Sequence, residues 1–416
     1  MNPLYNIGIS LYGAAARLAS LQSKKVSDMI AGQRATLDTL ESERLTKAPD
    51  GYDVWIHAAS LGEFEQGRPL IERLRREHPD KKILLTFFSP SGYNVRRNYD
   101  RVDTVAYLPF DTPARVKRFL DAAKPKMAIF VKYEFWGNYL EQLHRRGIPT
   151  YLISSIFRPG QRFFRPGGEW ARNMLRKFNH LYLQDEASRK LLAGIGIENT
   201  TVAGDTRFDR VTDIMRMAKE VKIAGKFTEN AKFTLIAGSS WPADEDIYIP
   251  WIKANPQVKA IIAPHEFDKE RLGLLRKRFA GKARLLSEIE FPSDLEGDEQ
   301  VLIIDCFGLL SSLYNYGSVA YIGGGFGAGI HNINEAAVFG IPVVFGPRHH
   351  KFKEASDLIA CGGGFEINNR EECTRVLDNM LNNPDARHSA GEAAADYIRH
   401  SIGATDLIYA DLFPKS

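Results

Sequence analysis

Cysteine is scarce in this chain, which has three among 416 residues, Cys306, Cys361 and Cys373, with no CxxC spacing. So few thiols, in an odd number, exclude a disulfide framework and a cysteine-rich zinc site, and they fit a reducing compartment. The sequence also lacks a strong excess of either charge. Lys and Arg total 55 against 51 for Asp and Glu, and this net charge of +4 gives no indication of nucleic acid as a partner.

No hydrophobic run resembles those of a polytopic membrane protein, and no cationic segment, apolar core and cleavage site form a secretory signal. Hydrophobic residues make up 44% of the chain and charged residues 25%, which excludes a disordered or collagen-like chain. The composition is therefore that of a globular protein, and the length predicts two or three domains.

The N-terminal stretch Leu4–Leu21 is apolar but short, and it contains polar positions. Arg17, Lys24 and Lys25 are the only charged residues among the first 27. Two interpretations stay open at this point. A short apolar helix followed by bases can lie in the headgroup region of an anionic leaflet, or it can pack on the next domain as an ordinary amphipathic helix.

From residue 52 onward, short apolar runs alternate with amphipathic stretches. The predicted strands of the first half span residues 53–58, 82–88, 103–110, 126–133, 150–155 and 180–185. After a break, the predicted strands of the second half span residues 233–240, 258–264, 301–306, 319–325 and 341–347. This rhythm predicts an α/β fold with two doubly wound parallel sheets that face a cleft.

Four segments follow from this pattern. We expect an N-terminal helical, membrane-associated segment (1–48), a first Rossmann-like domain (49–210), a second Rossmann-like domain (211–384) and C-terminal helices that pack back on the first domain (385–416). In open α/β sheets, ligands bind beyond the carboxyl ends of strands. The loops after strands are therefore the places to seek chemistry.

The first two strand-to-helix loops contain polar candidates. In HAASLGE, Ser60 and Gly62 permit a tight turn, and Glu63 falls at a helix start, where it serves either as a cap or as a general base. In TFFSPSG, the side chains and backbone of Ser89, Ser91 and Gly92 suit contact with a polar ligand or acceptor, or form a plain capped turn.

Two further charged residues lie at predicted strand ends in the first half. Glu134 in KYEFWGN is either a site carboxylate or a buried hydrogen-bonded cap. Arg207 in GDTRFD can hold a phosphate or carboxylate with two hydrogen bonds, or it can pair with Asp205 or Asp209.

The second half contains the most glycine-rich loop, GGGFGAGIHNINEA, at residues 323–336. Exposed backbone N–H groups at a helix start form a cradle for an anion. Gly323, Gly325 and Ala328 match a dinucleotide fingerprint only loosely, and no acidic ribose ligand follows, which argues against NAD. The adjacent pair His349 and His350 lacks the spacing to chelate one metal ion.

Together, these motifs resemble those of the 3-deoxy-D-manno-octulosonic acid (Kdo) transferases of lipopolysaccharide synthesis, glycosyltransferase family 30. The motifs occur in that family's order: HAASLGE, TFFSPSG, YLPFDTP, YEFWGN, GDTRFD, IIAPHE, DCFGLL and HNINEA. The resemblance implies a GT-B glycosyltransferase fold and inverting transfer of Kdo from CMP-Kdo to a lipid A precursor. It also implies no cofactor and no catalytic metal, and a location on the cytoplasmic face of the bacterial inner membrane.

The resemblance also assigns roles to residues. It makes Glu63 the catalytic base, and Glu134 and Arg207 stabilisers of the transition state. It places CMP on three segments, namely Pro264 and His265, then Gly308, Leu309 and Leu310, and then Asn332, Ile333, Asn334 and Glu335. The implied partners are CMP-Kdo, the lipid A precursor and an anionic inner-membrane surface, with no nucleic acid.

Several positions depart from the family pattern. The family usually has Arg at His265, an acidic residue at Leu309, Pro at Gly137 and Lys at Arg207, and it has Asn-x-Arg where this chain has residues 154–156. These departures indicate a divergent branch. The alternatives are a sugar-nucleotide epimerase or another GT-B transferase that uses a UDP-sugar, and a non-catalytic sugar- or nucleotide-binding protein.

Overall fold

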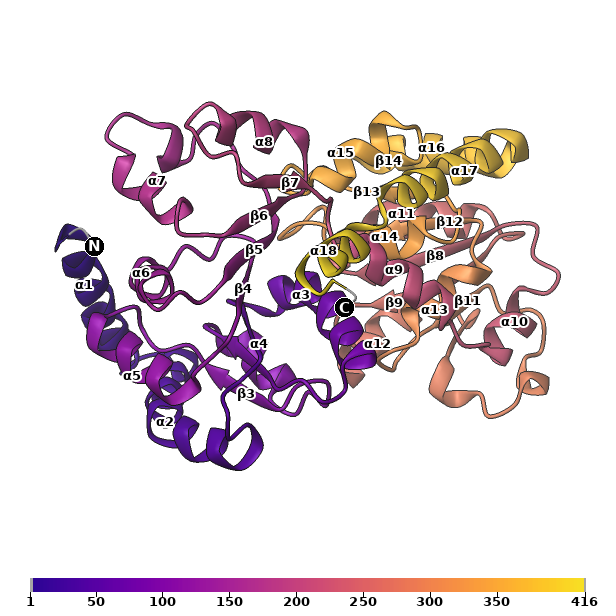
Figure 1. The fold of residues 1–416 in the computed structure, drawn as a ribbon. Helices are drawn as coiled ribbons and strands as arrows, with labels where there is room; N and C mark the ends of the chain where they lie inside the picture. Colours follow the sequence, from indigo (N-terminus) through magenta and orange to yellow (C-terminus); the bar gives the residue numbers. More distant parts are fainter. Residues whose placement is uncertain (1–2, 415–416) are drawn as a thin grey trace. The chain divides into compact units, whose positions relative to one another are not determined.

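In the computed structural model, which describes residues 3–414, the chain divides into two compact units. Unit 1 comprises Met1–Arg210 with Ile402–Ser416, and unit 2 comprises Val211–Ser401. Each unit holds one seven-stranded parallel sheet with helices around it (Figure 1). This confirms the predicted α/β class with two doubly wound sheets.

The sheet of unit 1 has the order β3-β2-β1-β4-β5-β6-β7. Its strands are β1 (Val54–Ala58), β2 (Ile83–Phe87), β3 (Thr104–Tyr107), β4 (Ala128–Val131), β5 (Thr150–Ser155), β6 (His180–Leu183) and β7 (Thr200–Val202). Every residue of β1, β2 and β4 is buried, as expected for a parallel sheet covered on both faces.

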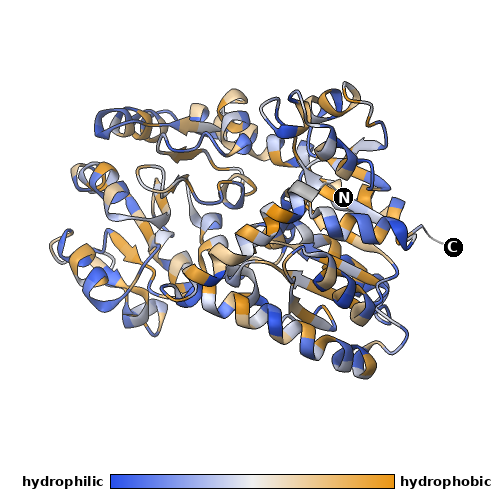
Figure 2. Cartoon of the chain, turned by 90° about the vertical axis from the view of Figure 1, so that its left-hand side faces the viewer, coloured by the Kyte–Doolittle hydropathy of each residue, from blue (hydrophilic) through white to orange (hydrophobic). Residues whose placement is uncertain are grey.

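Ten α-helices of the described chain belong to unit 1 wholly or in part. They are α1 (Pro3–Ala19), α2 (Lys24–Lys47), α3 (Leu61–Glu77), α4 (Pro90–Arg96), α5 (Pro113–Ala123), α6 (Gly137–Arg145), α7 (Glu169–Leu175), α8 (Glu186–Ala193), α9 (Arg207–Arg216), which crosses the division between the units, and α18 (Ala404–Leu412). A short 3₁₀ helix, η1, spans Arg162–Phe164. Hydrophobic and hydrophilic residues alternate along the helices in Figure 2, as expected for helices with one buried side.

The sheet of unit 2 has the order β10-β11-β9-β8-β12-β13-β14. Its strands are β8 (Thr234–Ser240), β9 (Lys259–Pro264), β10 (Ala283–Leu285), β11 (Val301–Ile303), β12 (Val319–Ile322), β13 (Val343–Phe345) and β14 (Gly364–Glu366). The α-helices of the unit are α10 (Lys222–Thr228), α11 (Pro242–Ala254), α12 (Lys269–Lys277), α13 (Leu310–Leu313), α14 (Asn334–Ala337), α15 (Lys353–Ala360), α16 (Arg370–Asn382) and α17 (Pro384–Ser401). Three 3₁₀ helices are η2 (Leu286–Glu288), η3 (Pro292–Asp294) and η4 (Tyr314–Tyr316).

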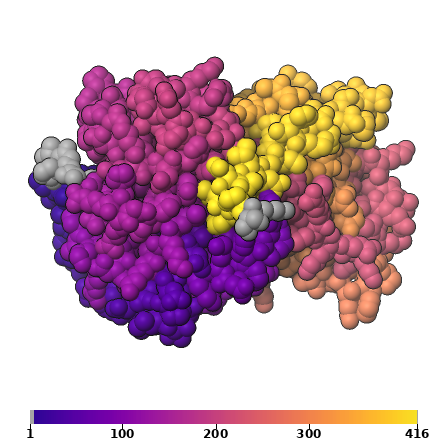
Figure 3. Space-filling view, viewed as in Figure 1, coloured from indigo at the N-terminus to yellow at the C-terminus, as the bar shows by residue number. Residues whose placement is uncertain are grey.

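The C-terminal segment predicted to pack on the first domain divides between the units. Helix α17 belongs to unit 2, and only residues from Ile402 onward belong to unit 1. There α18 lies against α3 (Figures 1 and 3), where Arg73 forms an ion pair with Asp406 and its guanidinium lies 4.3 Å from the ring centroid of Tyr409. The sequence gives no sign of this division because both helices are amphipathic.

Helix α1 is anchored to unit 1 by hydrogen bonds. The Tyr5 hydroxyl donates to Asp111 Oδ2 at 2.5 Å and accepts from the Gly137 N–H at 3.0 Å, and the Asn138 amide donates to Asn6 Oδ1 at 2.8 Å. One side of the helix therefore packs on the domain. Within residues 3–414, no helix is both long enough and apolar enough to cross a bilayer.

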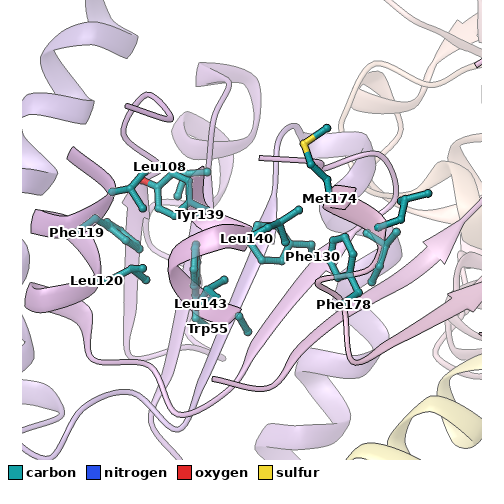
Figure 4. Close-up of a cluster of buried hydrophobic side chains, with 14 of the residues drawn as sticks. Trp55, Leu108, Phe119, Leu120, Phe130, Tyr139, Leu140, Leu143, Met174 and Phe178 are labelled. Carbon is teal, nitrogen blue, oxygen red and sulfur yellow. The ribbon is translucent and has the colours of Figure 1, made fainter. Parts of the chain in front are cut away.

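The larger core of unit 1 lies on one face of its sheet and is centred on Trp55 (Figure 4). The Trp55 ring lies 5.1 Å from Phe119, 5.2 Å from Phe130 and 5.6 Å from Tyr139, measured between centroids. Strand β1 sends Val54 and Ile56 to the core on the other face, as the period of two requires. Strand β1 thus connects both cores, and it precedes the first candidate loop directly.

Replacing Phe130 with Ala should lower the free energy of unfolding by about 3–5 kcal/mol, because it leaves a cavity beside Trp55. Urea denaturation measures this loss. Leu45→Ala is the control, since Leu45 is 59% exposed on α2 and its removal should change the free energy by less than about 0.5 kcal/mol. Equal effects of the two variants would contradict the assigned core.

Candidate functional site

Each sheet has a switch point, where the chain passes from one half of the sheet to the other. In unit 1 the switch point lies between β1 and β4; Glu63 lies in the first turn of the helix after β1, and Glu134 in the loop after β4. In unit 2 it lies between β8 and β12, and the glycine-rich loop follows β12. A crevice outside the carboxyl ends of strands at a switch point is the usual ligand position in such sheets.

Glu63 lies in the first turn of α3 and caps that helix. Its Oε2 accepts hydrogen bonds from the Ser60 N–H at 3.0 Å and the Ser60 hydroxyl at 3.2 Å. Among the described residues, nothing is recorded as a hydrogen-bond partner of its other oxygen. Glu63 therefore does cap α3, which was one of the two interpretations from the sequence. Its other carboxylate oxygen remains available to accept a proton.

The electrostatic surroundings of Glu63 favour its protonated form. Burial raises the pKa of Glu63 above its ordinary value, and the nearby carboxylate of Glu134 raises it further, while His57 and the Ser60 hydrogen bonds oppose the shift. A carboxylate whose pKa is raised toward neutrality is better matched to accept a proton in catalysis.

Glu134 is 7% exposed, and two ring N–H groups contact its Oε2. The Trp136 indole donates to it at 2.5 Å, and His57 Nε2 lies 3.1 Å away. One alternative from the sequence was that Glu134 is a buried, hydrogen-bonded helix cap. Glu134 is buried and hydrogen-bonded, but it precedes α6 and does not cap that helix. The His57–Glu134 contact joins β1 to the loop after β4 across the switch point.

Both ring nitrogens of His57 have partners on neighbouring elements. Nδ1 lies 2.9 Å from the Thr86 hydroxyl, and that hydroxyl already accepts from the Trp55 indole at 2.8 Å. Because a carboxylate only accepts, Nε2–H donates to Glu134. We expect the Thr86 hydroxyl to donate to Nδ1, which also lies 3.1 Å from the Thr86 carbonyl oxygen. With these bonds, His57, Thr86 and Glu134 all have partners in this buried region, as burial requires.

Sequence reasoning did not select His57 as a site residue, although it begins the HAASLGE motif. One signal was available. His57 is the single strongly polar side chain in a five-residue strand that is buried on both faces, and its relative exposure is 0%. A polar ring at such a position needs partners on neighbouring strands, which here are Thr86 and the loop of Glu134.

Arg207 is held by a buried carboxylate. Its Nε and Nη2 donate to Asp205 Oδ2 at 2.9 and 2.7 Å, and the Gln66 amide donates to both oxygens of Asp205. The Arg207 guanidinium holds the pKa of Asp205 below its ordinary range despite the burial. The pairing interpretation of Arg207 is thus observed, and the guanidinium keeps 27% of its side-chain surface exposed.

The remaining loop candidates of unit 1 have local structural roles. Ser89 caps α4, where its hydroxyl accepts from the Ser91 N–H at 3.3 Å and lies 3.0 Å from the Ser91 hydroxyl. A Cβ on Gly92 would lie 2.2 Å from the Phe87 ring, so this position requires glycine. Gly62 lies inside α3 without a positive φ, and the tight turn expected there is absent.

Three non-glycine residues near strand ends have left-handed backbone angles. They are Lys132 after β4 (φ 67°), Ser154 in β5 (φ 52°) and Ser239 in β8 (φ 53°). Such conformations cost free energy and concentrate at functional sites. Each of the three lies at the carboxyl end of its strand, at the edge of its own sheet where the candidate loops begin.

In unit 2, an aromatic stack follows β8 and β9. The His265 ring lies 4.5 Å from Trp241 and 4.6 Å from His331, with interplanar angles of 25° and 30°. The Trp241 indole donates to His331 Nε2 at 3.3 Å, and burial together with His265 lowers the pKa of His331. Pro264 ends β9 just before this stack. Pro264 and His265 were predicted as site residues from the sequence, whereas Trp241 and His331 were not.

The other two predicted nucleotide segments differ in their burial. Gly308 has a φ of 87°, and Leu309 and Leu310 begin α13 behind it. A Cβ on Gly238, at the end of β8, would lie 3.2 Å from Leu310, so this segment reaches the switch-point strand. Ile333 is 1% exposed and packs in the interior, which is a structural role.

Asn334 is the most unusual of the predicted nucleotide residues. Its side chain is buried, at 1% exposure, yet among the described residues neither its amide nitrogen nor its amide oxygen has a hydrogen-bond partner. The neighbouring Asn332 accepts from the Asn334 N–H at 3.2 Å and donates to Glu335 at 3.0 Å. Buried unpartnered polar groups are rare and require an explanation, which a bound ligand supplies.

The glycine-rich loop after β12 is held closely against β8. Gly323 N donates to Gly238 O at 2.9 Å, and a Cβ on Gly323 would lie 2.2 Å from Ser239 O. Asp244, which sequence reasoning missed, accepts from the Gly324 N–H at 2.8 Å. The loop therefore has one fixed backbone path.

Among residues 3–414, no group of three or more His, Cys, Asp or Glu side chains is arranged to hold a metal ion.

Comparisons with known proteins agree with this geometry. A family model described as 3-deoxy-D-manno-octulosonic-acid transferase (kdotransferase) matches residues 21–210. The chain is 30% identical over 336 residues to a 3-deoxy-D-manno-octulosonic acid transferase from Aquifex aeolicus, covering 79% of this chain and 86% of that protein. It is 26% identical over 381 residues to the transferase of the same name from Haemophilus influenzae, covering 88% of each.

Among solved structures, the chain is similar to UDP-GlcNAc 2-epimerase from Neisseria meningitidis. The TM-score is 0.60 at 14% identity, covering 87% of this chain and 100% of that one. At this identity the likeness shows the fold alone. It confirms the two Rossmann-like units of the expected GT-B architecture.

The tautomer of His57 is directly testable. In ¹⁵N-labelled protein, histidine NMR should show a protonated Nε2 and an unprotonated Nδ1, because Thr86 donates to Nδ1 and Glu134 accepts from Nε2. His57→Gln identifies the signal, and Thr86→Val should perturb it. A protonated Nδ1 beside an unprotonated Nε2 would contradict the arrangement.

Proposed function

Because the chain belongs to the family of 3-deoxy-D-manno-octulosonic acid (Kdo) transferases, glycosyltransferases of lipopolysaccharide biosynthesis, we propose that it moves Kdo from CMP-Kdo onto a lipid A precursor. Glu63 is the general base of this proposal. The observation that carries the assignment is a partly buried carboxylate with a raised pKa and one oxygen without a partner among the described residues, at the switch point of unit 1.

The proposed reaction inverts the anomeric centre. An acceptor hydroxyl gives its proton to Glu63 while its oxygen bonds to the anomeric carbon of Kdo. The bond from that carbon to the phosphate oxygen breaks, and CMP leaves with the electron pair. Ser60 fixes Glu63 Oε2, so the proton goes to the other oxygen of the same carboxylate. General-base assistance of this kind contributes about 10²–10⁴-fold to the rate.

Glu134 and Arg207 are assigned to charges that develop during transfer. Trp136 and His57 fix the Glu134 carboxylate, which suits it to support positive charge on an oxocarbenium-like sugar. Asp205 fixes the Arg207 guanidinium in one orientation, and its exposed part is directed to the growing negative charge of the phosphate. In both cases a buried partner removes the freedom to reorient, which is the basis of electrostatic preorganisation.

Unit 2 is assigned to the nucleotide. The Asn334 amide offers its N–H₂ donors and its acceptor oxygen without partners among the described residues, which is the combination needed to recognise a nucleoside. The stacked rings of Trp241, His265 and His331 form a flat aromatic surface in the same unit. The backbone of the glycine-rich loop supplies N–H groups for phosphate. Family membership favours CMP-Kdo over a UDP-sugar, since the epimerase likeness extends to the fold only.

We place the enzyme at the cytoplasmic face of the inner membrane, on its anionic surface. The support is the outward side of α1, where Ile7 is 55%, Leu11 66% and Leu18 70% exposed. These residues lie on the side opposite the buried Ala16, so the helix offers an apolar stripe with Arg17 beside it. A lipid acceptor requires such an approach.

Glu63→Gln should lower the rate of Kdo transfer by about 10²–10⁴-fold while CMP-Kdo binding is unchanged, because glutamine keeps the cap on Ser60 but accepts no proton. Product masses measure transfer, and isothermal titration calorimetry measures donor binding.

Glu77→Gln is the matched control for this variant. Glu77 is the last residue of the same helix and pairs with Arg73, so its replacement should leave transfer within twofold of wild type. Wild-type transfer by Glu63→Gln would remove Glu63 from the mechanism. Loss of donor binding together with transfer would show a structural role instead.

Glu134→Gln should move the acid limb of the kcat/KM profile to lower pH. Glu63 must be ionised to act, so activity falls as pH drops through its pKa, which lies above the ordinary 4.5. Glu134 contributes to that raised pKa by charge repulsion, and glutamine removes the charge.

The pH profile separates this effect from any loss of rate. The position of the limb reports the pKa of the base, whereas its height reports transition-state stabilisation. Glu77→Gln should leave the limb in place. A limb that stays fixed in Glu134→Gln, or moves to higher pH, would contradict the coupling of the two carboxylates.

A further inference from the structure

A cavity of about 330 Å³ lies among α1, α2 and α5 of unit 1. Figure 1 shows these three helices side by side, and Figure 2 turns this side of the unit to the viewer. Four arginines from the three helices line the cavity: Arg17, Arg34, Arg115 and Arg118. A neighbouring cavity of about 250 Å³ shares Arg17 and Arg115 with it.

The positive charge of this cavity is not balanced by acidic groups. Arg118 pairs with Asp38 at 2.9 Å, but within residues 3–414 no carboxylate forms an ion pair with Arg17, Arg34 or Arg115. Burial and the charges of Arg17 and Arg34 together lower the pKa of Arg115. These like charges lie close together, and the protein supplies no counter-charge beside them. This arrangement indicates that a bound ligand supplies the negative charge.

Gln33 provides a second, independent indication. This residue is 2% exposed and lines the same cavity. Its Oε1 accepts from the Phe110 N–H at 3.1 Å, which fixes the amide, but its Nε2 has no hydrogen-bond partner in the part of the chain that the structure describes. A buried N–H₂ without an acceptor destabilises the protein unless a ligand supplies one. The cavity thus combines an unsatisfied neutral donor with three cationic donors, and it needs acceptors only.

We infer that this arginine cavity, defined by Arg17, Gln33, Arg34 and Arg115, binds a phosphate group carried by a membrane lipid. A phosphate offers several acceptor oxygens in different directions, which suits donors from three helices, and arginine forks match it with paired hydrogen bonds. The lipid origin follows from α1, whose exposed apolar stripe flanks Arg17, and this part of the inference alone rests on the proposed membrane-surface function.

The test compares two lipid headgroups on vesicles of equal surface charge. Phosphatidylcholine vesicles contain either phosphatidic acid, a phosphate monoester, or phosphatidylglycerol, a diester with fewer free oxygens. Flotation without CMP-Kdo measures binding and requires no turnover. Wild type should bind the phosphatidic acid vesicles more tightly. Arg34→Gln with Arg115→Gln should weaken that binding about 30-fold, since each base at an anionic leaflet contributes roughly fivefold.

Two further variants keep the outcome interpretable. Arg145→Gln with Arg189→Gln removes the same charge from exposed pairs on α6 and α8, and should weaken binding less than threefold. Arg34→Lys with Arg115→Lys keeps the charge but loses the paired hydrogen bonds, and should bind both vesicles alike. Equal losses in the two glutamine variants, or headgroup preference retained in the lysine variant, would overturn the site.

Inorganic phosphate separates the two sources of the ligand. Calorimetric binding of free phosphate that depends on Arg34 and Arg115, without a vesicle preference, would overturn the lipid origin. Glu63→Gln should float with vesicles like wild type. Failure of the transfer proposal therefore leaves this binding result intact, and failure of the binding result leaves transfer intact.

Discussion

Burial of both parallel sheets on both faces is the constraint on which the rest of the structure depends. Strands such as β1, β2 and β4 admit apolar side chains on either side, so polar chemistry is confined to the loops beyond their ends. His57 is the exception within β1. Its ring must find partners inside the protein, and it finds them on Thr86 and Glu134. This requirement fixes Glu134 at the switch point, where its charge acts on Glu63.

The protein uses charge in two contrasting ways. In the candidate site of unit 1, each functional charge has a protein partner: Glu63 has Ser60, Glu134 has His57, and Arg207 has Asp205. Those partners fix the orientation of the charged side chains. In the arginine cavity, the charges have no such partners among the described residues, and the site is incomplete until an anion arrives. The first arrangement suits catalysis and the second suits capture.

Much of the fold could be predicted from the sequence because buried parallel strands read as apolar runs. The runs at 82–88 and 126–133 contain β2 and β4, whose residues are all buried. The edge strands β7, β10 and β14 were missed, since each has three residues and partial burial. No local pattern shows that α17 and α18 belong to different units, because that depends on distant contacts such as those of Asp209 with Gly403.

The candidate site was predicted in outline, through loops placed after strands. Glu63 and Glu134 do lie at the switch point of unit 1, as the topology demands. Their partners were not predictable, because the His57–Glu134 bond joins residues 77 positions apart and the Asp205–Gln66 bond joins residues 139 apart. Asn334 shows the same limit, since its lack of partners is a property of the folded chain alone.

The most direct test of the central claim is the product made by the wild-type protein from CMP-Kdo and a tetraacyl lipid A precursor. Mass spectrometry gives the mass added to the acceptor, and NMR gives the anomeric configuration of the new bond. The account predicts a gain of one or more Kdo residues, each with a configuration inverted relative to CMP-Kdo. An acceptor of unchanged mass, or a product with retained configuration, would contradict it.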